Sequence, residues 1–416
     1  MAGANDGLTC RHCDTPLDLL FADLGATPIS NEFIYPEHLN GAEAFYPLKT
    51  YACRACRLVQ LQNFFKSSDL FRPNYAYFSS VSSTWLDHCR RYAEAMTARF
   101  GLGAKSQVVE LASNDGYLLQ YFKAAGIPVL GVEPSLSVAE VAIKERGIPT
   151  EVRFFGRETA TDLAARGQSA DLIAANNVLA HVPDINDFVA GVQILLKPEG
   201  VATFEFPHLL NLIRLNQFDT IYHEHFSYLS LLAAERIFGA AGLRVFDVDQ
   251  IPTHGGSIRL YVCHQDATPA DQPGLNAVRA LEAEAKLDAD EPYVAYAEQV
   301  RETKRELLEL LIRLKREGKT IVGYGAPAKG NTLLNYCGIG ADMLEFTVDA
   351  SPHKQGLYLP GTRLPIRAPE AIAEAKPDYV LILPWNLQAE IMQQMQGIRA
   401  WGGAFIVPIP KAQVVA

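Results

Sequence analysis

The stretch from Val108 to Leu119 constrains the fold of this chain more than any other segment. An apolar run, Val108 to Leu111, is followed by the polar turn Ser113-Asn114-Asp115-Gly116 and then by an amphipathic helical pattern. This order predicts a buried strand, a tight turn and a helix, the unit from which α/β cofactor domains are built. The polar residues can cap the helix, and the glycine allows a ligand close to the backbone.

Acidic side chains make this turn suited to a cation. A pyrophosphate site would carry Gly-x-Gly-x-x-Gly, whereas this segment supplies Glu110 and Asp115. A second apolar strand, Val129 to Val132, precedes Glu133, whose carboxylate can accept hydrogen bonds from both hydroxyls of a ribose. We therefore expect S-adenosylmethionine as the cofactor. A nicotinamide dinucleotide would use the same acid, and a strand–turn–helix without any ligand is the structural alternative.

Composition limits the partners and the compartment. A formal net charge of −10 and a pI near 5.5 argue against nonspecific binding to nucleic acid. The first residues lack the pattern of a signal peptide, and no apolar run is long enough to span a bilayer. We expect a cytoplasmic protein, monomeric, without a nucleic-acid or membrane partner.

Two Cys-x-x-Cys pairs predict a zinc site. Cys10 and Cys13 form the first pair, and Cys53 and Cys56 form the second. Four thiolates complete a tetrahedral zinc and leave no open position, so the expected metal is structural rather than catalytic. In a reducing compartment this spacing favours metal binding over disulfides. We expect a small zinc-binding domain over residues 1–69.

Alternating strand and helix patterns predict two α/β domains after the zinc-binding domain. Four apolar strands, at residues 108–111, 129–132, 171–175 and 201–206, predict a doubly wound, mostly parallel sheet within residues 70–276. An approach segment rich in serine and aromatic residues, including Tyr75 and Tyr77, precedes it. A charged helical stretch from about Ala277 to Glu317 then leads to a second Rossmann-like domain, within residues 277–416.

The segment from Ile221 to Tyr228 concentrates proton-transfer groups: Tyr222, His223, Glu224, His225 and Tyr228. A neutral imidazole is a natural general base, and a neighbouring carboxylate can orient it. A metal site is disfavoured because His-Glu-x-x-His is absent, and a satisfied polar cluster is the structural alternative. Asn176, Asn177 and His181 follow the third strand, so they belong at the carboxyl edge of the sheet, where ligands bind.

Two glycine-rich turns could meet a substrate. The turn around Gly255 and Gly256 places His254, Ser257 and Arg259 together, an arrangement suited to an anionic or polyhydroxyl ligand. The later turn, Gly323 to Gly330, includes Lys329 at a predicted helix start, which favours a diphosphate group. No Ser or Thr follows the lysine, so this is not an ATPase loop. A purely structural turn is the alternative.

Four motifs in this order resemble the zinc-containing, S-adenosylmethionine-dependent C-methyltransferases of nucleotide-linked deoxysugars, the C-3′-methyltransferases of antibiotic biosynthesis in particular. The motifs are the four cysteines, residues 110–116, residues 222–225 and residues 323–330. The resemblance implies dTDP-3-amino-2,3,6-trideoxy-4-keto-D-glucose as the substrate, methylated at C3′ through an enolate. Alternatives are a C5-methyltransferase, a nicotinamide-dependent sugar oxidoreductase, an RNA or protein methyltransferase, and a noncatalytic sugar-nucleotide sensor.

The resemblance also implies roles for individual residues. His225 would be the base, while Tyr222, Glu224 and His181 would orient it, stabilise the enolate oxygen or hold the sugar. The methyl donor would contact Glu110, Asn114, Gly116, Glu133 and Asn177. The sugar nucleotide would contact Ser80, Ser257 and Lys329, and the structural zinc would be bound by Cys10, Cys13, Cys53 and Cys56.

Overall fold

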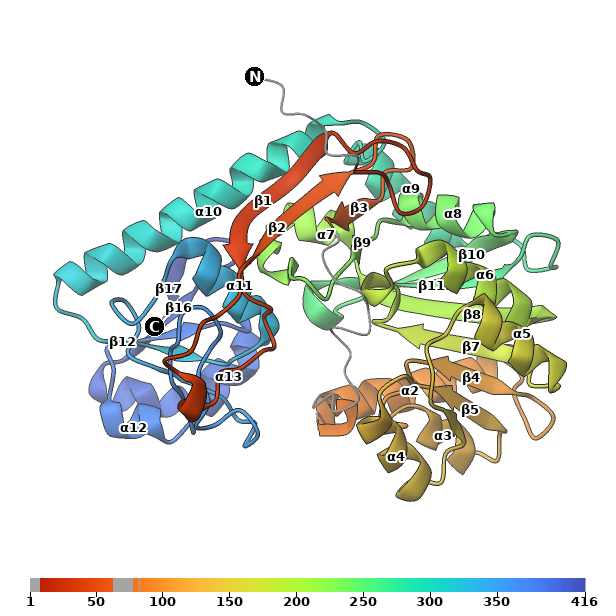
Figure 1. The fold of residues 1–416 in the computed structure, drawn as a ribbon, viewed down its shortest axis with the longest axis horizontal. Helices are drawn as coiled ribbons and strands as arrows, with labels where there is room; N and C mark the ends of the chain where they lie inside the picture. The colour runs from red at the N-terminus through yellow and green to blue at the C-terminus, as the bar shows by residue number, and fades with distance from the viewer. Residues whose placement is uncertain (1–7, 63–77, 82, 416) are drawn as a thin grey trace.

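The protein is described here by a computed structural model that covers residues 8–62, 78–81 and 83–415. The aromatic approach at Tyr75 and Tyr77, and the expected domain boundary between residues 69 and 70, lie outside the described residues. Figure 1 shows the chain as three sheets. A small sheet lies beside the long helix α10, a large sheet carries helices on both faces, and a third sheet forms a separate body near the C-terminus.

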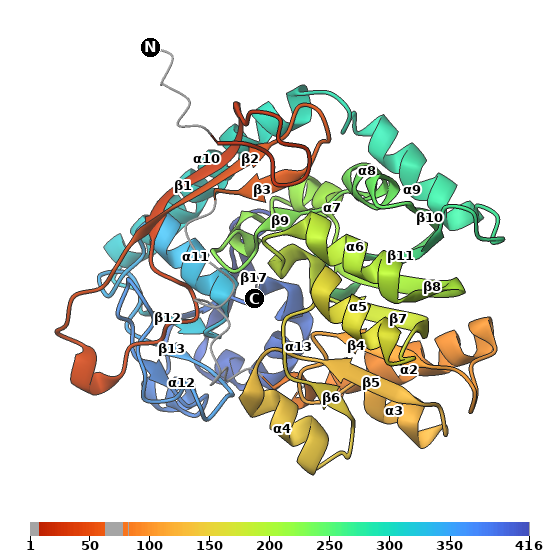
Figure 2. The same ribbon diagram turned by 45° about the vertical axis from the view of Figure 1, so that its right-hand side comes forward.

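The small N-terminal sheet is antiparallel and includes one strand from much later in the chain. Its order is β1 (Leu19–Thr27), β2 (Tyr46–Ala52), β3 (Val59–Leu61) and β9 (Ser227–Tyr228). In Figure 2 strand β9 runs beneath β3, at the junction with the central domain. The segment that directly follows Tyr222–His225 is therefore hydrogen-bonded to the N-terminal domain.

The central sheet is doubly wound, with a switch in strand order at β4. Its order is β10 (Leu243–Ile251), β11 (Ser257–His264), β8 (Leu196–Pro207), β7 (Ala170–Asn176), β4 (Val108–Leu111), β5 (Val129–Val132) and β6 (Thr150–Glu151). The strands from β8 to β6 are parallel, and β11 is antiparallel to β8. The carboxyl ends of β4 and β7 meet at the switch, where open α/β sheets bind ligands.

Alternation along the central strands explains why helices cover both faces. Val109 and Leu111 of β4 pack in one core with helices on one face, while Val108 packs in a second core on the other. The first face carries α5 (Arg157–Ala165), α6 (Ile185–Leu195), α8 (Leu231–Ala240) and α9 (Pro273–Glu284). The second carries α2 (Ser83–Phe100) and α3 (Leu119–Ala124). Helices α4 (Leu136–Lys144) and α7 (Leu209–Arg214) complete the domain.

The C-terminal sheet repeats the doubly wound plan. Its order is β14 (Ile366–Arg367), β13 (Thr347–Val348), β12 (Ile321–Tyr324), β15 (Tyr379–Ile382), β16 (Ala404–Val407) and β17 (Gln413–Val415), parallel except for β17. Its helices are α11 (Ala328–Cys337), α12 (Ala371–Ala375) and α13 (Gln388–Gln394). Together the three sheets confirm the predicted fold class, a zinc-binding domain followed by two Rossmann-like α/β domains.

The charged stretch expected to be one helix from about Ala277 to Glu317 forms two. Helix α9 ends at Glu284, and α10 (Glu291–Arg316) begins after a turn in which Lys286 has a φ of 54° and Leu287 is buried. Helix α10 buries a stripe at helical spacing, from Tyr293 to Leu314, against β1. The ring of Phe21 stacks on Tyr296 at 4.3 Å.

Candidate active site and zinc centre

The turn after β4 is polar and lies at the switch point of the central sheet. Ala112 and Asn114 adopt left-handed backbone angles, with φ of 52° and 48°. The backbone N–H of Asn114 donates to Glu133 Oε2 at 3.0 Å, and its side-chain Oδ1 accepts from Ser79 N–H at 3.0 Å. The turn therefore connects the ends of β4 and β5, as a ribose-binding acid requires.

Buried polar groups without hydrogen-bond partners among the described residues mark this edge as a ligand site. Both side-chain polar atoms of Asn176 are in this state, whereas the Tyr117 hydroxyl and the Leu119 N–H face the Glu110 carboxyl and oppose the rise in its pKa. Such groups are costly unless a ligand or water completes them. Burial raises the pKa of Glu110 well above its usual value, and it also raises the pKa of Glu133. A cationic ligand bearing hydroxyl and amino groups fits this donor and acceptor set.

Gly116 serves packing rather than ligand access. Its φ is 77°, and an added Cβ would lie 2.5 Å from Ile148 Cδ1 and 3.3 Å from Ala142 Cβ. The side of this glycine thus faces the core. Gly116 therefore shapes the turn, and only its backbone atoms remain to contact a ligand.

Glu205 is a buried carboxylate that was not identified from the sequence, and it binds several side chains near the carboxyl edge of the central sheet. Glu205, in β8, accepts hydrogen bonds from Arg259 at 2.7 Å, His88 at 3.0 Å and Thr253 Oγ1 at 3.1 Å. Burial raises the pKa of Glu205, but His88 and Arg259 outweigh this effect and leave the pKa below its usual value. A lone acid inside the apolar run of residues 201–206 was the signal that could have found it.

The Glu205 network fixes the turn that carries His254. His254 has a φ of 54°, an uncommon angle for a residue with a side chain, and Asn177 Nδ2 lies 3.4 Å from its Nε2. The ring of Trp85 lies 5.6 Å from that of His254. His254 therefore lies beside Asn177 at the carboxyl edge of the central sheet. Ser257, expected to hold the sugar, is buried, and its hydroxyl donates to the Thr253 carbonyl within the same turn.

The Tyr222–His225 loop contains a fixed imidazole. His225 Nδ1 lies 2.8 Å from the Thr220 carbonyl, so Nδ1 bears the hydrogen and Nε2 is the acceptor. The Tyr222 hydroxyl lies 2.7 Å from that Nε2. Burial lowers the pKa of His225 well below its usual value, with a smaller contribution from His181. The imidazole is therefore neutral at physiological pH and presents a basic nitrogen.

His181 lies beside this imidazole, with a ring-centroid distance of 4.7 Å. Its Nδ1 lies 2.8 Å from the main-chain carbonyl of Glu224, so Nδ1 bears the hydrogen and Nε2 is an acceptor. Burial lowers the pKa of His181 to about 4. A neutral His181 can accept a hydrogen bond from a hydroxyl or amine of a sugar, whereas it has no second N–H for an enolate oxygen.

Glu224 is buried in the same loop and receives a hydrogen bond from the N-terminal domain. Asn31 Nδ2 donates to Glu224 Oε1 at 2.7 Å. Burial raises the pKa of Glu224 to about 7; the bond from Asn31 opposes that rise, and Glu32 adds to it. Near neutral pH both forms of this carboxyl group are present. His223, by contrast, points to the N-terminal sheet, 3.2 Å from the Pro47 carbonyl.

Lys329, in α11 of the C-terminal domain, is close enough to the loop from Ile221 to His225, here called the reaction loop, for its charge to lower the pKa of His225. Its Nζ donates to Asn386 Oδ1 at 2.6 Å and lies 4.9 Å from the ring centroid of Trp385. Trp385 Nε1 donates to the buried Asp219 at 2.7 Å, immediately before the reaction loop. Burial lowers the pKa of Lys329 and raises that of Asp219 to about 6.

Ser80 lies against the turn after β4. Its hydroxyl donates to Asp115 Oδ2, and Arg146 forms an ion pair with Asp115 at 3.2 Å. The structure therefore groups Ser80 with the residues expected to hold the methyl donor rather than with those of the reaction loop.

Four cysteine thiols converge in the N-terminal domain. The Sγ atoms of Cys10, Cys13, Cys53 and Cys56 all lie within 4.8 Å of one another. Cys10 to Cys56 and Cys13 to Cys53 are each 3.5 Å apart, close to the ~3.8 Å that four Zn–S bonds of ~2.3 Å impose on a tetrahedron. The knuckles have matching turns, since Asp14 N–H donates to the Cys10 carbonyl and Arg57 N–H to that of Cys53. The set fits zinc.

Comparisons with known proteins agree with this organisation. A zinc-binding domain profile matches residues 10–71, a methyltransferase domain profile matches residues 85–248, and the profile of the C-methyltransferase C-terminal domain matches residues 252–410. The C-methyltransferase NovU of Streptomyces niveus is 37% identical over 409 residues, which cover 98% of this chain and 96% of that protein.

Two further relatives match only part of the chain. The ubiquinone biosynthesis O-methyltransferase of Rhizobium etli is 27% identical over 114 residues, 25% of this chain and 45% of that protein. Among solved structures, magnesium protoporphyrin IX methyltransferase from Synechocystis with bound SAH superposes with a TM-score of 0.35 and 15% identity. It covers 47% of this chain and 92% of that one.

The doubly wound sheet, its acidic switch point and the full-length relative define an S-adenosylmethionine-dependent methyltransferase with an additional zinc-binding domain. Within that class, the chain belongs to the C-methyltransferase family. No described helix has the length and apolarity needed to cross a membrane.

Proposed function

We propose that the protein methylates C3′ of a dTDP-linked 3-amino-2,3,6-trideoxy-4-keto-D-glucose. The observation that carries the proposal is the neutral, buried imidazole of His225, fixed by the Thr220 carbonyl with its Nε2 aimed at the Tyr222 hydroxyl. A carbon next to a ketone becomes a nucleophile only after it loses a proton, and a positioned neutral base in a buried site suits that step.

The proposed methyl transfer breaks one bond and forms one bond at C3′. The C3′–H bond breaks, its proton goes to His225 Nε2, and its electron pair forms the enolate with oxygen O4′. S-adenosylmethionine, when bound, supplies a methyl group on a sulfonium, and the C3′–CH₃ bond forms as the sulfur takes the electrons of the broken C–S bond. The protonated fraction of Glu224 would donate a hydrogen bond to the developing oxyanion. The Tyr222 hydroxyl, which donates to Nε2 in the free protein, would turn to the oxyanion as Nε2 takes the C3′ proton.

The remaining site residues support binding. Glu110, Asn114, Glu133 and Asn177 would hold the methyl donor at the switch point, with Gly116 shaping the turn. Lys329 and His254 would contact the sugar nucleotide, with His181 as an acceptor for the sugar. Cys10, Cys13, Cys53 and Cys56 would hold the structural zinc. The position of the methyl-donor residues at the carboxyl edge of the central sheet supports their assignment, and the family resemblance supports the others.

The test incubates the protein with methyl-labelled S-adenosylmethionine and the 3-amino-4-keto dTDP-sugar and locates the label by mass spectrometry and NMR. Label on C3′ is the expected result. Label on C5′ would replace the proposed regiochemistry with that of a C5-methyltransferase on a dTDP-4-keto-6-deoxysugar. No transfer by zinc-loaded protein that binds both ligands would refute the proposed substrate.

A further inference from the structure

We propose that Asn31 is a positioning residue for this reaction: the N-terminal domain supplies its carboxamide to hold one oxygen of Glu224, which reserves the other oxygen for the substrate. The inference rests on the proposed function and adds a role for a residue in a different domain from the reaction loop.

The contact itself fixes which oxygen is free to act. Asn31 Nδ2 lies 2.7 Å from Glu224 Oε1, and Glu224 is 5% exposed. Because an amide nitrogen only donates, Oε1 must accept, and any carboxyl proton resides on Oε2. Within the described part of the chain, no other side chain forms a hydrogen bond with this carboxyl group. Oε2 is thus the oxygen that remains to donate a hydrogen bond when the carboxyl group is protonated, and we assign this bond to the oxyanion of the proposed reaction.

One helix holds the main chain on both sides of this contact. Asn331 Nδ2 of α11 donates to the Ser30 carbonyl at 2.6 Å, and the adjacent Thr332 Oγ1 donates to the Ile221 carbonyl at 3.0 Å. Ser30 immediately precedes Asn31, and Ile221 begins the reaction loop. Two consecutive residues of α11 therefore set the separation between the Asn31 amide and the Glu224 carboxyl.

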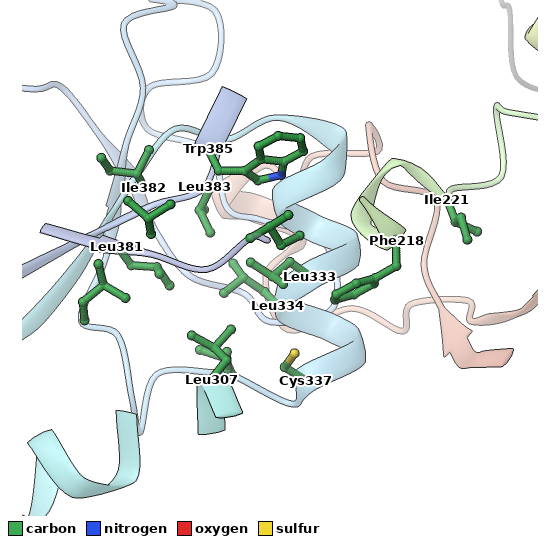
Figure 3. Close-up of a cluster of buried hydrophobic side chains, with 14 of the residues drawn as sticks. Phe218, Ile221, Leu307, Leu333, Leu334, Cys337, Leu381, Ile382, Leu383 and Trp385 are labelled. Atoms are coloured by element: carbon green, nitrogen blue, oxygen red, sulfur yellow. The ribbon is translucent and has the colours of Figure 1, made fainter. Parts of the chain in front are cut away.

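Helix α11 is packed within a cluster of buried hydrophobic side chains, as Figure 3 shows. Leu333, Leu334 and Cys337 are buried between the C-terminal strands and Phe218, which lies just before the reaction loop. Close packing on both sides limits movement of the helix. The Asn31–Glu224 contact is therefore assembled from all three domains.

The pKa of Glu224 depends on burial, on the hydrogen bond from Asn31 and on the neighbouring charge of Glu32. Burial raises its pKa to about 7, the Asn31 bond lowers it and the neighbouring Glu32 raises it. Of the other groups near the loop, His181 bonds to the main-chain carbonyl, and α11 contributes the uncharged Asn331 and Thr332, while its Lys329 bonds to Asn386. Removal of the Asn31 donor should raise the pKa of Glu224, and a carboxylate in its place should raise it further.

The experiment compares Asn31→Ala and the isosteric Asn31→Asp with the wild type in the full zinc-loaded protein. We expect kcat at neutral pH to fall by about tenfold to a hundredfold because the donor is displaced. The alkaline limb of the kcat profile should move to higher pH, further in Asn31→Asp than in Asn31→Ala. Asn276→Ala, on the exposed face of α9, is the matched control and should leave the profile unchanged.

A second background separates positioning from general damage. In Glu224→Gln the side chain that Asn31 contacts no longer titrates. Adding Asn31→Ala to this variant should therefore leave both limbs of the kcat–pH profile where they are. Titration of ¹³C-labelled Glu224 by NMR, assigned with Glu224→Gln, reads its pKa without any turnover. The inference would be overturned if the wild type is active and the Asn31 variants show the same alkaline limb of the kcat profile and the same NMR pKa of Glu224 as the wild type. A wild type inactive on the sugar, with an NMR pKa that still moves, would refute only the proposed substrate.

Discussion

The imidazole of His225 shows how one main-chain contact decides the chemistry of a side chain. The Thr220 carbonyl accepts from Nδ1, so the basic nitrogen is Nε2, and burial keeps the ring neutral. The sequence identified the residue types, because histidine, glutamate and tyrosine occur together at high density. It could not identify their partners, since Thr220 offers only a carbonyl that every residue has.

Removing this base should abolish turnover without removing the ligands. We predict that His225→Asn lowers kcat by about a hundredfold or more, because a positioned base supplies about that factor. Binding of S-adenosylmethionine, measured by calorimetry, should stay within twofold, about 0.4 kcal/mol. Substantial methyl transfer by this variant would exclude His225 as the base.

Glu224 should make stability depend on pH. Its pKa is raised from 4.5 to about 7 in the folded protein, so the stability it contributes is complete below pH 4.5 and is lost as pH rises through 7. Between pH 4.5 and 8 the unfolding free energy of the wild type should fall relative to that of Glu224→Gln by about 3 kcal/mol. Urea unfolding at several pH values measures the difference; parallel curves would contradict the assignment.

Other single residues show where sequence reasoning stops. The family resemblance implies Ser257 and Ser80 as contacts of the sugar nucleotide. In the structure each hydroxyl already donates a hydrogen bond within the protein. Ser257 donates to the Thr253 carbonyl, and Ser80 donates to Asp115. Asn31 carried no sequence signal, because its partner lies 193 residues away.

At the scale of elements, the turn after β4 depends on a glycine for two separate reasons. Gly116 and Gly126 have nearly the same φ, 77° and 75°, but only Gly116 has a neighbour where a Cβ would lie. Gly126→Ala should cost about 1 kcal/mol of unfolding free energy from backbone strain. Gly116→Ala should cost at least about 1 kcal/mol more because Ile148 must shift. Equal losses in urea unfolding would show that Ile148 does not constrain the turn.

The central strands could be predicted because apolar runs separated by helical patterns signal a parallel sheet directly. The antiparallel strands β10 and β11 were not predicted; only the glycine-rich turn between them, around Gly255 and Gly256, was identified from the sequence. The break between α9 and α10 was also missed. It depends on burial of Leu287 and on the left-handed Lys286, neither of which interrupts the charged pattern of the sequence.

At the scale of the whole molecule, the N-terminal domain is continuous with the reaction loop. Strand β9 pairs with β3, and β3 follows directly on Cys53 and Cys56. The loop from Tyr222 to His225 is therefore held by the zinc-binding domain at its far end and by α11 at its start. This continuity was not visible in the sequence, because antiparallel pairing between distant short strands leaves no local pattern.

Loss of zinc should consequently lower the rate of methyl transfer while the binding of S-adenosylmethionine is kept. We predict that Cys53→Ser loses the bound metal, measured by atomic emission, and lowers methyl transfer more than tenfold, about 1.4 kcal/mol of barrier. S-adenosylmethionine should still bind, since the switch point lies on the central sheet. A metal-free variant with full activity would refute a structural role for the four cysteines.

The central claim is that the methylated atom is a carbon that must first lose its proton to the His225 loop. The most direct measurement supplies the dTDP-sugar with deuterium at C3′ and determines by mass spectrometry whether the methylated product keeps it. We predict that the wild type gives a product that has lost the deuterium and that His225→Asn forms this product at least about a hundredfold more slowly. A methylated product that retains the deuterium would place the methyl group on another atom and would contradict the account.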